Sequence, residues 1–136
     1  MNARRPAVEE VVGVAEFRAA LRRFLRHSER VARSSGLTPQ RYLLLLMIKG
    51  ASDGSEQSTV TELAERLQLA QSTVTELVSR AEEAGLVERE QSMSDARVAH
   101  LRLTAEGERR LGRAFTGLAA ERAELREAFQ HLEGTL

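Results

Sequence analysis

The chain has 136 residues, of which 42% are hydrophobic and 29% are charged, and this fits one folded domain rather than a disordered chain. It contains no cysteine, which excludes disulfides, a thiolate zinc site and a thiol-based redox switch. No apolar run approaches the roughly 20 residues of a membrane span and no signal peptide is recognisable, so we expect a cytoplasmic bacterial protein that does not bind membranes.

Residues 7–34 are predicted to form one long helix with a narrow apolar seam. The seam positions are spaced alternately by three and four residues: Val14, Phe17, Leu21, Phe24, Ser28 and Val31. A narrow seam on a long helix is typical of packing against another long helix. Packing onto the rest of its own domain is the alternative.

A second, buried helix is expected next. Thr38 is predicted as its N-cap with Pro39 in the first turn, residues 42–48 are too apolar to face solvent, and Gly50 is expected as the C′ residue. The polar loop 50–58 lacks the G-K-[ST] ending of a phosphate-binding loop, so we interpret it as a plain connection.

Residues 59–84 carry the pattern of two helices joined by a tight turn. The motif Thr59-Val60-Thr61-Glu62 is a capping box that opens the first helix, and residues 68–70 form the turn. The second helix, at about 71–84, ends at Gly85. Its core stripe has the spacing i, i+3, i+4 and i+7: Val74, Leu77, Val78 and Ala81.

The opposite face of that second helix carries mostly short polar side chains. Such a face can enter the major groove of DNA, where Gln, Ser and Thr contact base edges and an arginine reaches guanine or phosphate. An ordinary solvated face is the alternative, and Glu76 favours it unless its carboxylate accepts from a cytosine amine. The candidate DNA-contacting residues are Gln71, Ser72, Thr73, Thr75, Glu76, Ser79 and Arg80.

A two-stranded ribbon is expected next, with strands at 86–90 and 97–103 joined by a polar tip at 91–96. Asp95 and Arg97 point the same way in an extended strand, so Asp95 can hold an arginine in place or Arg97 can enter the minor groove. A surface ion pair is the alternative. Helix, turn, helix and ribbon together make a winged helix-turn-helix, whose second helix fits the major groove.

Charge is distributed unevenly along the chain. Residues 1–35 hold eight arginines against four acids, residues 36–90 hold five basic and nine acidic residues, and residues 91–136 hold seven of each. The helix-turn-helix block is therefore acidic as a whole. DNA affinity has to come from a local face, from the ribbon, and from two copies in a dimer.

Thr104 is predicted to cap a last helix, with Glu106 in its first turn. Its apolar stripe is interrupted by Arg122 and consists of Leu111, Phe115, Leu118, Leu125, Phe129 and Leu132. Gly112 and Gly117 disfavour a helix and mark a bend or a close helix contact. Long helices at both ends of a small DNA-binding core favour pairing with a second subunit.

From Leu37 to Gly107 the sequence resembles the MarR (multiple antibiotic resistance regulator) family. Each matching piece is weak alone, and their order and spacing together are specific. The pieces are Leu37-Thr38 with residues 42–46, Thr61-Glu62-Leu63-Ala64 with Leu67, Ser72-Thr73-Val74-Thr75 with Leu77-Val78, Gly85-Leu86-Val87-Glu88-Arg89, Ser94-Asp95-Ala96-Arg97, and residues 101–103 with Thr104-Ala105-Glu106-Gly107.

The resemblance implies a mainly α fold with a small β-ribbon (α+β). Residues 1–136 would form a single domain. Its winged helix-turn-helix lobe would span 37–107, and long dimerisation helices would lie at 7–35 and 108–136.

The resemblance also implies a function: a homodimer that binds a pseudo-palindromic operator in double-stranded DNA through the recognition helix at 71–84. The implied wing contacts are Arg89, Ser94, Asp95 and Arg97. Arg97 would enter the minor groove, braced by Asp95. Such proteins are usually repressors, and a small, often phenolic or otherwise aromatic, anion then lowers their affinity for DNA.

Three features depart from the family pattern. Position 96 is alanine where a second arginine is common, and Ser92-Met93-Ser94 at the tip is uncharged, which weakens the expected contact of the wing with phosphate. Only 29 residues follow Gly107, so the final dimer helix is expected to be truncated or fused with the preceding one. The cysteine of peroxide-sensing members is absent.

For the effector, the sequence indicates only a location, between the dimer helices and the DNA lobe. The candidate pocket residues are Phe17, Leu21, Tyr42, Met47 and Phe115, with Arg18, Arg22 or Arg41 attracting an anion. Plain core and plain surface are the alternative for each of them.

The sequence leaves two other classes of function to consider. A winged-helix module that binds protein or acts architecturally, without sequence-specific DNA readout, is favoured by the acidic central block. An enzyme is disfavoured because His27, His100 and His131 lie in different elements, and there is no serine elbow, Walker loop or dinucleotide motif. We therefore expect no enzymatic activity, no cofactor and no metal.

Overall fold

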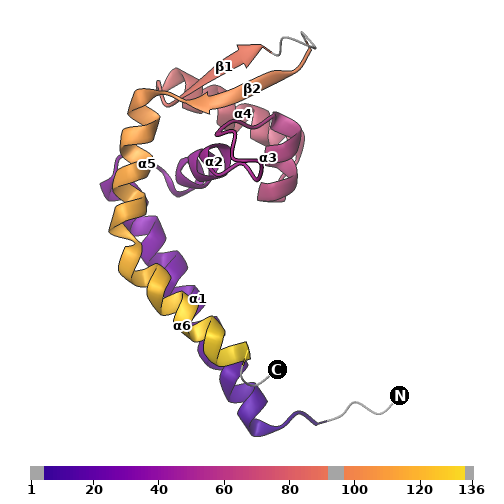
Figure 1. Ribbon diagram of the computed structural model, residues 1–136, viewed down its shortest axis with the longest axis vertical. Helices are drawn as coiled ribbons and strands as arrows, with labels where there is room; N and C mark the ends of the chain where they lie inside the picture. Colours follow the sequence, from indigo (N-terminus) through magenta and orange to yellow (C-terminus); the bar gives the residue numbers. More distant parts are fainter. Residues whose placement is uncertain (1–4, 92–96, 134–136) are drawn as a thin grey trace.

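The computed structural model describes residues 5–91 and 97–133. A helical head carries a two-stranded ribbon, and a long stalk of helices extends from it (Figure 1). The elements in chain order are α1 (Val8–Ser34), α2 (Pro39–Lys49), α3 (Val60–Leu67), α4 (Gln71–Glu83), β1 (Val87–Gln91), β2 (Ala99–Leu103), α5 (Ala105–Gly117) and α6 (Ala119–Glu133). This order confirms the predicted mainly α fold with one ribbon. Within the described ranges, no helix has the length and apolar character needed to cross a membrane.

The centre of the head is α2. Its fully buried side chains are Leu44, Leu45 and Ile48. The predicted N-cap is confirmed, because Thr38 Oγ1 accepts a hydrogen bond from the Arg41 amide at 3.1 Å. The prediction of Gly50 as the C′ residue is wrong by one position, because Gly50 is the C-cap of α2, with a φ of −90°. A Cβ there would lie 2.9 Å from the Leu46 carbonyl oxygen, which accepts the Gly50 amide in the last turn of the helix.

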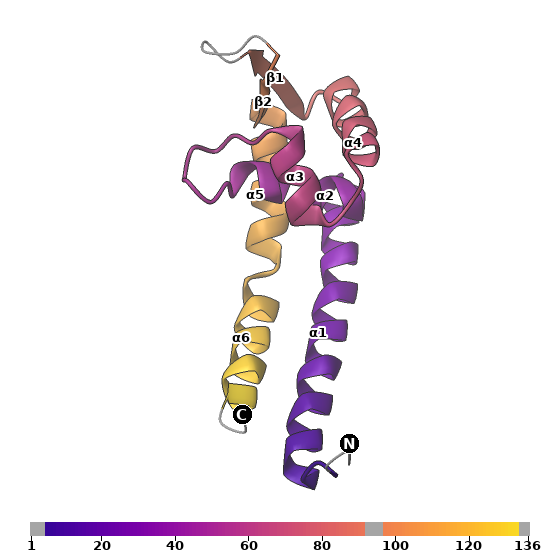
Figure 2. The same ribbon diagram turned by 90° about the vertical axis from the view of Figure 1, so that its right-hand side faces the viewer.

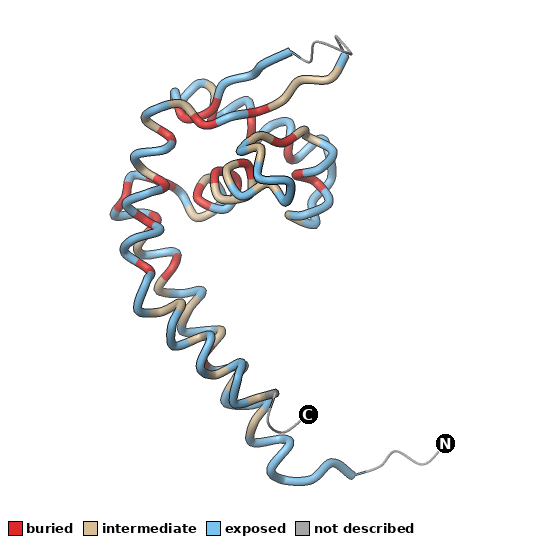
Figure 3. Tube along the Cα trace, viewed as in Figure 1, coloured by how far each residue is buried: buried red, intermediate tan, exposed pale blue. Residues whose placement is uncertain are grey.

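The stalk consists of α1 and α6, which run antiparallel and side by side away from the ribbon (Figure 1 and Figure 2). The predicted seam of α1 is divided between two faces. Phe17 faces α6 and makes an edge-to-face contact with Phe129, with 6.0 Å between ring centroids. Val14 is 47% exposed. Packing onto its own chain therefore accounts for only part of the seam, and buried residues gather mainly in the head (Figure 3).

The C-terminal segment forms two helices. Helix α5 ends at Gly117, and Leu118, with a φ of −108°, separates it from α6. A Cβ on Gly117 would lie 3.0 Å from Cγ1 of Val31, so this glycine allows close contact with α1 beside the fully buried Leu118. The alternative of one fused helix is therefore wrong. Gly112 has no neighbour within 4 Å of a Cβ position and therefore marks no close helix contact.

Candidate nucleic-acid interface

Helices α3 and α4 form the helix-turn-helix. The capping box predicted for α3 is confirmed: Thr59 Oγ1 accepts from the Glu62 amide at 3.2 Å, and Glu62 Oε1 accepts from the Thr59 amide at 3.1 Å. Gln68 ends α3 in the left-handed conformation, with φ of 57°, and α4 begins three residues later. The fully buried side chains of α4 are Val74, Val78 and Ala81. These three positions fix which side of α4 faces solvent.

The side of α4 opposite this stripe is exposed. All seven candidate DNA-contacting residues of α4 are exposed: Gln71, Ser72, Thr73, Thr75, Glu76, Ser79 and Arg80. Helical periodicity places them correctly on the surface, because only one orientation buries the apolar stripe. Their contact with DNA remains a prediction.

Three polar contacts organise this exposed face. Arg80 Nη2 donates to Glu76 Oε1 at 2.7 Å, one turn away on the same helix. The Thr75 hydroxyl donates to the Gln71 carbonyl oxygen at 2.9 Å, and Gln71 Nε2 reaches Thr61 Oγ1 of α3 at 3.4 Å. The Thr75 hydroxyl proton is thus engaged within the helix, which leaves its oxygen as an acceptor.

The ribbon that forms the wing is antiparallel, with Val87 opposite Leu103 and Arg89 opposite Leu101. Sequence placed the first strand one residue early, at 86–90. Leu86 is instead fully buried ahead of β1, and its carbonyl oxygen accepts from the Thr104 amide at 3.0 Å, the bond that closes the base of the ribbon.

The second strand is shorter than predicted. Arg97 does not begin the strand but lies exposed in a turn before β2, which starts at Ala99. The other two tip contacts expected, Ser94 and Asp95, fall outside the described residues, as does the expected bracing of Arg97 by Asp95.

Ser58 holds the ribbon to the head by pairing with the other edge of β2. Its amide donates to the Leu101 carbonyl oxygen at 3.1 Å, and the Leu101 amide donates back to the Ser58 carbonyl oxygen at 2.8 Å. Ser58 is 2% exposed. Sequence reasoning missed this contact, because one serine at the end of a polar loop carries no strand pattern.

Some of the acidic residues of the lobe form ion pairs with arginines on the same surface. Arg89 Nε of β1 donates to Glu82 Oε1 of α4 at 2.8 Å, which ties the ribbon to α4. Arg102 Nη1 lies 3.6 Å from Glu90 Oε2 across the ribbon. The role of Glu82 was not foreseen, because the pair joins residues seven apart in two different elements.

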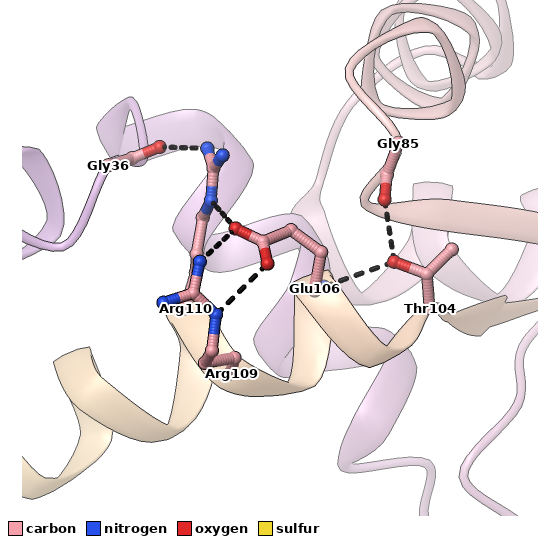
Figure 4. A network of polar contacts seen from close by, with 7 residues as sticks. Gly36, Gly85, Thr104, Glu106, Arg109 and Arg110 are labelled. Carbon is pink, nitrogen blue, oxygen red and sulfur yellow. Dashed lines mark hydrogen bonds and ion pairs between the residues drawn. The ribbon is translucent and has the colours of Figure 1, made fainter.

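A polar network joins the ribbon, α5 and the turn after α1 (Figure 4). Thr104 Oγ1 donates to the Gly85 carbonyl oxygen at 2.6 Å. It also accepts from the Gly107 amide in the first turn of α5. Arg110 donates to Glu106 at 2.8 Å and to the Gly36 carbonyl oxygen at 2.9 Å. Hydrogen bonds from Arg109 and then Arg110 lower the pKa of the Glu106 carboxyl to about 2. The head and the top of the stalk are thus linked.

The five residues predicted for the effector pocket do not line one cavity. Leu21 borders an outer groove of α1 with Arg18 and Arg22, whereas Phe17 lines a groove between α1 and α6. Met47 is half-buried in α2, packed against the core. Tyr42 is buried in the head. The side chain of Phe115, on α5, is 48% exposed.

Arg122 lies close to Phe115, shares a groove with Phe17 and acts on Tyr42 through its charge. Its guanidinium lies 3.8 Å from the ring centroid of Phe115, and its Nη1 donates to the Phe115 carbonyl oxygen at 2.6 Å. It also lines the groove that contains Phe17. Burial raises the pKa of Tyr42, and the nearby charge of Arg122 acts against that rise. In the sequence this arginine looked like an interruption of an apolar stripe.

The histidines lie apart from this surface. His27 Nε2 of α1 is 3.1 Å from Glu121 Oε1 of α6, while His100 lies on β2 and His131 on α6. Among the described residues, no three His, Asp or Glu side chains gather in a way that could hold a metal ion.

Comparisons with known proteins agree with this geometry. The sequence model of the MarR family matches residues 35–98. YusO from Bacillus subtilis shares 23% identity, with 96% of this chain and 95% of that one covered and a TM-score of 0.65. AbsC, a MarR family transcriptional regulator from Streptomyces coelicolor, shares 22% identity over 96% and 84% of the chains, with a TM-score of 0.69.

A third similar structure is that of overoxidised AbfR bound to DNA. It shares 28% identity over 84% of this chain and 82% of that one, with a TM-score of 0.59. No protein of curated function matches at the level of sequence. The match of the family model over residues 35–98 and the fold agree: the chain is similar to the MarR family of transcriptional regulators.

Proposed function

We propose that the protein acts in the cytoplasm as a homodimeric repressor, which binds a pseudo-palindromic operator and leaves it when a small ligand binds. The observation that carries the proposal is the polar surface of α4, where seven side chains are exposed while the apolar stripe of the same helix is fully buried. In a helix-turn-helix, that face of the second helix lies in the major groove. The similar protein AbfR has been solved bound to DNA.

In this proposal the wing supplies the second contact. Arg97 lies exposed in the turn before β2 and would enter the adjacent minor groove, which attracts arginine through its negative potential. Arg89, ion-paired to Glu82, would lie against the backbone and keep the ribbon at a fixed angle to α4.

A dimer is favoured by the outer face of α1. Val11, Val14 and Leu25 are each about half exposed there, at 50%, 47% and 51%. With half-buried Leu21 they form a second seam at heptad spacing, 3, 7 and 4 residues apart. Such a row of apolar side chains along a long exposed helix is typical of an interface. A dimer also places two lobes on the DNA. Because affinity for DNA rises with the number of phosphates contacted, the second lobe offsets the repulsion from the acidic residues of each lobe.

The effector site is proposed around Arg122. Its guanidinium supplies a cation, while the Phe115 ring and the groove containing Phe17 supply apolar walls. An aromatic anion matches this combination of charge and ring faces. Because Arg122 belongs to α6 and contacts α5, a ligand there would act on the junction between stalk and head.

The experiment is selection of genomic fragments on the purified protein, with Arg97→Ala in parallel and at several salt concentrations. We expect enrichment of an inverted repeat, with affinity that falls steeply as salt rises, and a loss of about tenfold or more on Arg97→Ala. Arg113→Ala is the matched control, because it removes the same charge from an exposed position on α5, away from α4 and the ribbon. An Arg97→Ala protein that binds like the wild type contradicts the role of the wing.

A second candidate is a winged-helix module that binds another protein. The observation that favours it is the charge of residues 36–90, nine acidic against five basic. A dimer that enriches no DNA sequence at low salt would favour this candidate over the repressor.

A further inference from the structure

An unusual feature of the DNA-facing side of α4 is a carboxylate in the middle of it. Glu76 and Arg80 lie one turn apart, both side chains are 64% exposed, and the Arg80 Nη2 to Glu76 Oε1 distance is 2.7 Å. The buried stripe of α4 faces the opposite way, so the pair points out of the head. An exposed pair of this kind adds little to the stability of the fold. We therefore look for its effect in the binding of DNA.

Glu76 changes what Arg80 can do on DNA. An arginine alone is attracted to every phosphate and therefore binds all sequences. Paired with a carboxylate, the guanidinium is neutralised and held in one direction, with its remaining N–H groups directed outward in a fixed fork. That fork matches O6 and N7 of guanine, and the free lone pairs of the carboxylate match the N4 amine of cytosine.

On the basis of the DNA-binding function proposed above, we propose that Glu76 is the specificity-determining residue of the recognition helix. Its carboxylate accepts from a cytosine amine in the major groove and positions Arg80 on a guanine one or two base steps away. Where the cytosine is absent, the outward lone pairs of the carboxylate meet no donor in a groove lined by phosphates, and binding is penalised. The pair therefore converts a general attraction to DNA into a requirement for C·G pairs.

The competing explanation is that Glu76 only lowers the charge of the helix. Glu83 provides the matched comparison, since it lies on α4 two turns further along nearly the same side and is also exposed. No contact from the Glu83 side chain to an arginine is found within residues 5–91 and 97–133. Glu83→Ala removes the same charge without breaking a pair, and alanine suits a helix at either position.

The experiment is selection of binding sites from random double-stranded DNA with wild type, Glu76→Ala and Glu83→Ala, followed by salt titration on the selected sites. We expect a cytosine position in the wild-type and Glu83→Ala sites whose preference falls by about 5- to 150-fold in Glu76→Ala. Glu76→Ala should also bind unrelated DNA more tightly. The slope of log affinity against log salt should steepen by about 0.9 for each phosphate that Arg80 gains.

Two results overturn the inference and are distinguishable. If Glu76→Ala selects the same bases as the wild type, or if Glu83→Ala loses the same preference, Glu76 acts only through charge while the repressor proposal stands. If the wild-type protein itself enriches no sequence, the proposed function fails, and the role of Glu76 fails with it.

Discussion

Glu106 lies at the centre of a network of polar contacts at the junction between head and stalk (Figure 4). Its carboxylate accepts from Arg109 and Arg110, and Arg110 also binds the Gly36 carbonyl oxygen. These hydrogen bonds hold the pKa of Glu106 at about 2, against an ordinary value of 4.5. The junction is thus a charged cluster, in contrast to the apolar core of the head.

We predict that Glu106 titrates near pH 2 in the folded protein and that Arg109→Gln moves its pKa toward 4.5. Because the folded-state pKa is lowered, the carboxylate stabilises the fold at pH values above 4.5, and this contribution is lost as pH falls from 4.5 through 2. NMR titration of the side-chain carboxyl carbon measures the pKa directly. Arg113→Gln, an exposed change on the same helix, should leave it unchanged.

A wild-type Glu106 that titrates near 4.5 would show that the two arginines do not hold it in solution. An equal shift in the Arg113→Gln protein would attribute the lowered pKa to the overall charge of α5 and not to direct hydrogen bonds.

At the scale of the elements, α5 packs closely against the segment that leads into the wing, at Gly107. A Cβ at this position would collide with the carbonyl oxygen of Leu86 and would lie 3.4 Å from Cβ of Leu103. The obstructing oxygen belongs to the backbone and accepts the Thr104 amide that closes the ribbon, so it cannot move aside alone. The wing can therefore lie this close to α5 only because residue 107 is a glycine, which has no side chain.

We predict that Gly107→Ala lowers the free energy of unfolding by about 1–3 kcal/mol, because the helix has to move off the ribbon. Gly112→Ala on the same helix should raise it by about 0.5–1 kcal/mol, because no atom lies within 4 Å of the new Cβ and alanine favours a helix. Urea unfolding of both variants measures the difference. Equal effects of the same sign would show that helix propensity dominates and that the contact with Leu86 relaxes.

The elements also show what sequence can and cannot predict here. The capping box at Thr59 and the buried stripe of α4 depend on residues within a turn or two of one another, so local spacing predicts them. The pairing of Ser58 with β2 and the contact of Gly117 with α1 join distant segments, and neither has a local pattern. Arg122 belongs to the second group, since its place beside Phe115 depends on the break between α5 and α6.

At the scale of the whole molecule, the long stalk is incompletely covered by its own chain. α6 packs along one side of α1, where Phe17 meets Phe129. The other side of α1 exposes Val11, Val14 and Leu25 by about half each. A stalk held by one antiparallel contact leaves an apolar seam in water, and a second copy of the chain can bury it.

We predict that the wild-type protein is a dimer at micromolar concentration and that Leu25→Glu weakens the dimer by about 100-fold or more. An unpaired carboxylate buried in an apolar seam costs several kcal/mol, which exceeds the loss of one leucine contact. Sedimentation velocity over a range of concentrations measures the dimer. Gln130→Glu adds the same charge at an exposed position of α6 and should leave the mass unchanged.

The same variant separates assembly from DNA recognition. Leu25 lies far along the chain from α4 and the ribbon, so Leu25→Glu should keep the helical content while its affinity for an inverted repeat falls toward that for a single half-site. A Leu25→Glu protein that remains dimeric would place the interface elsewhere on the stalk. A monomeric wild type that binds one half-site as tightly as the full repeat would remove the need for a dimer, and each acidic lobe would then bind DNA alone.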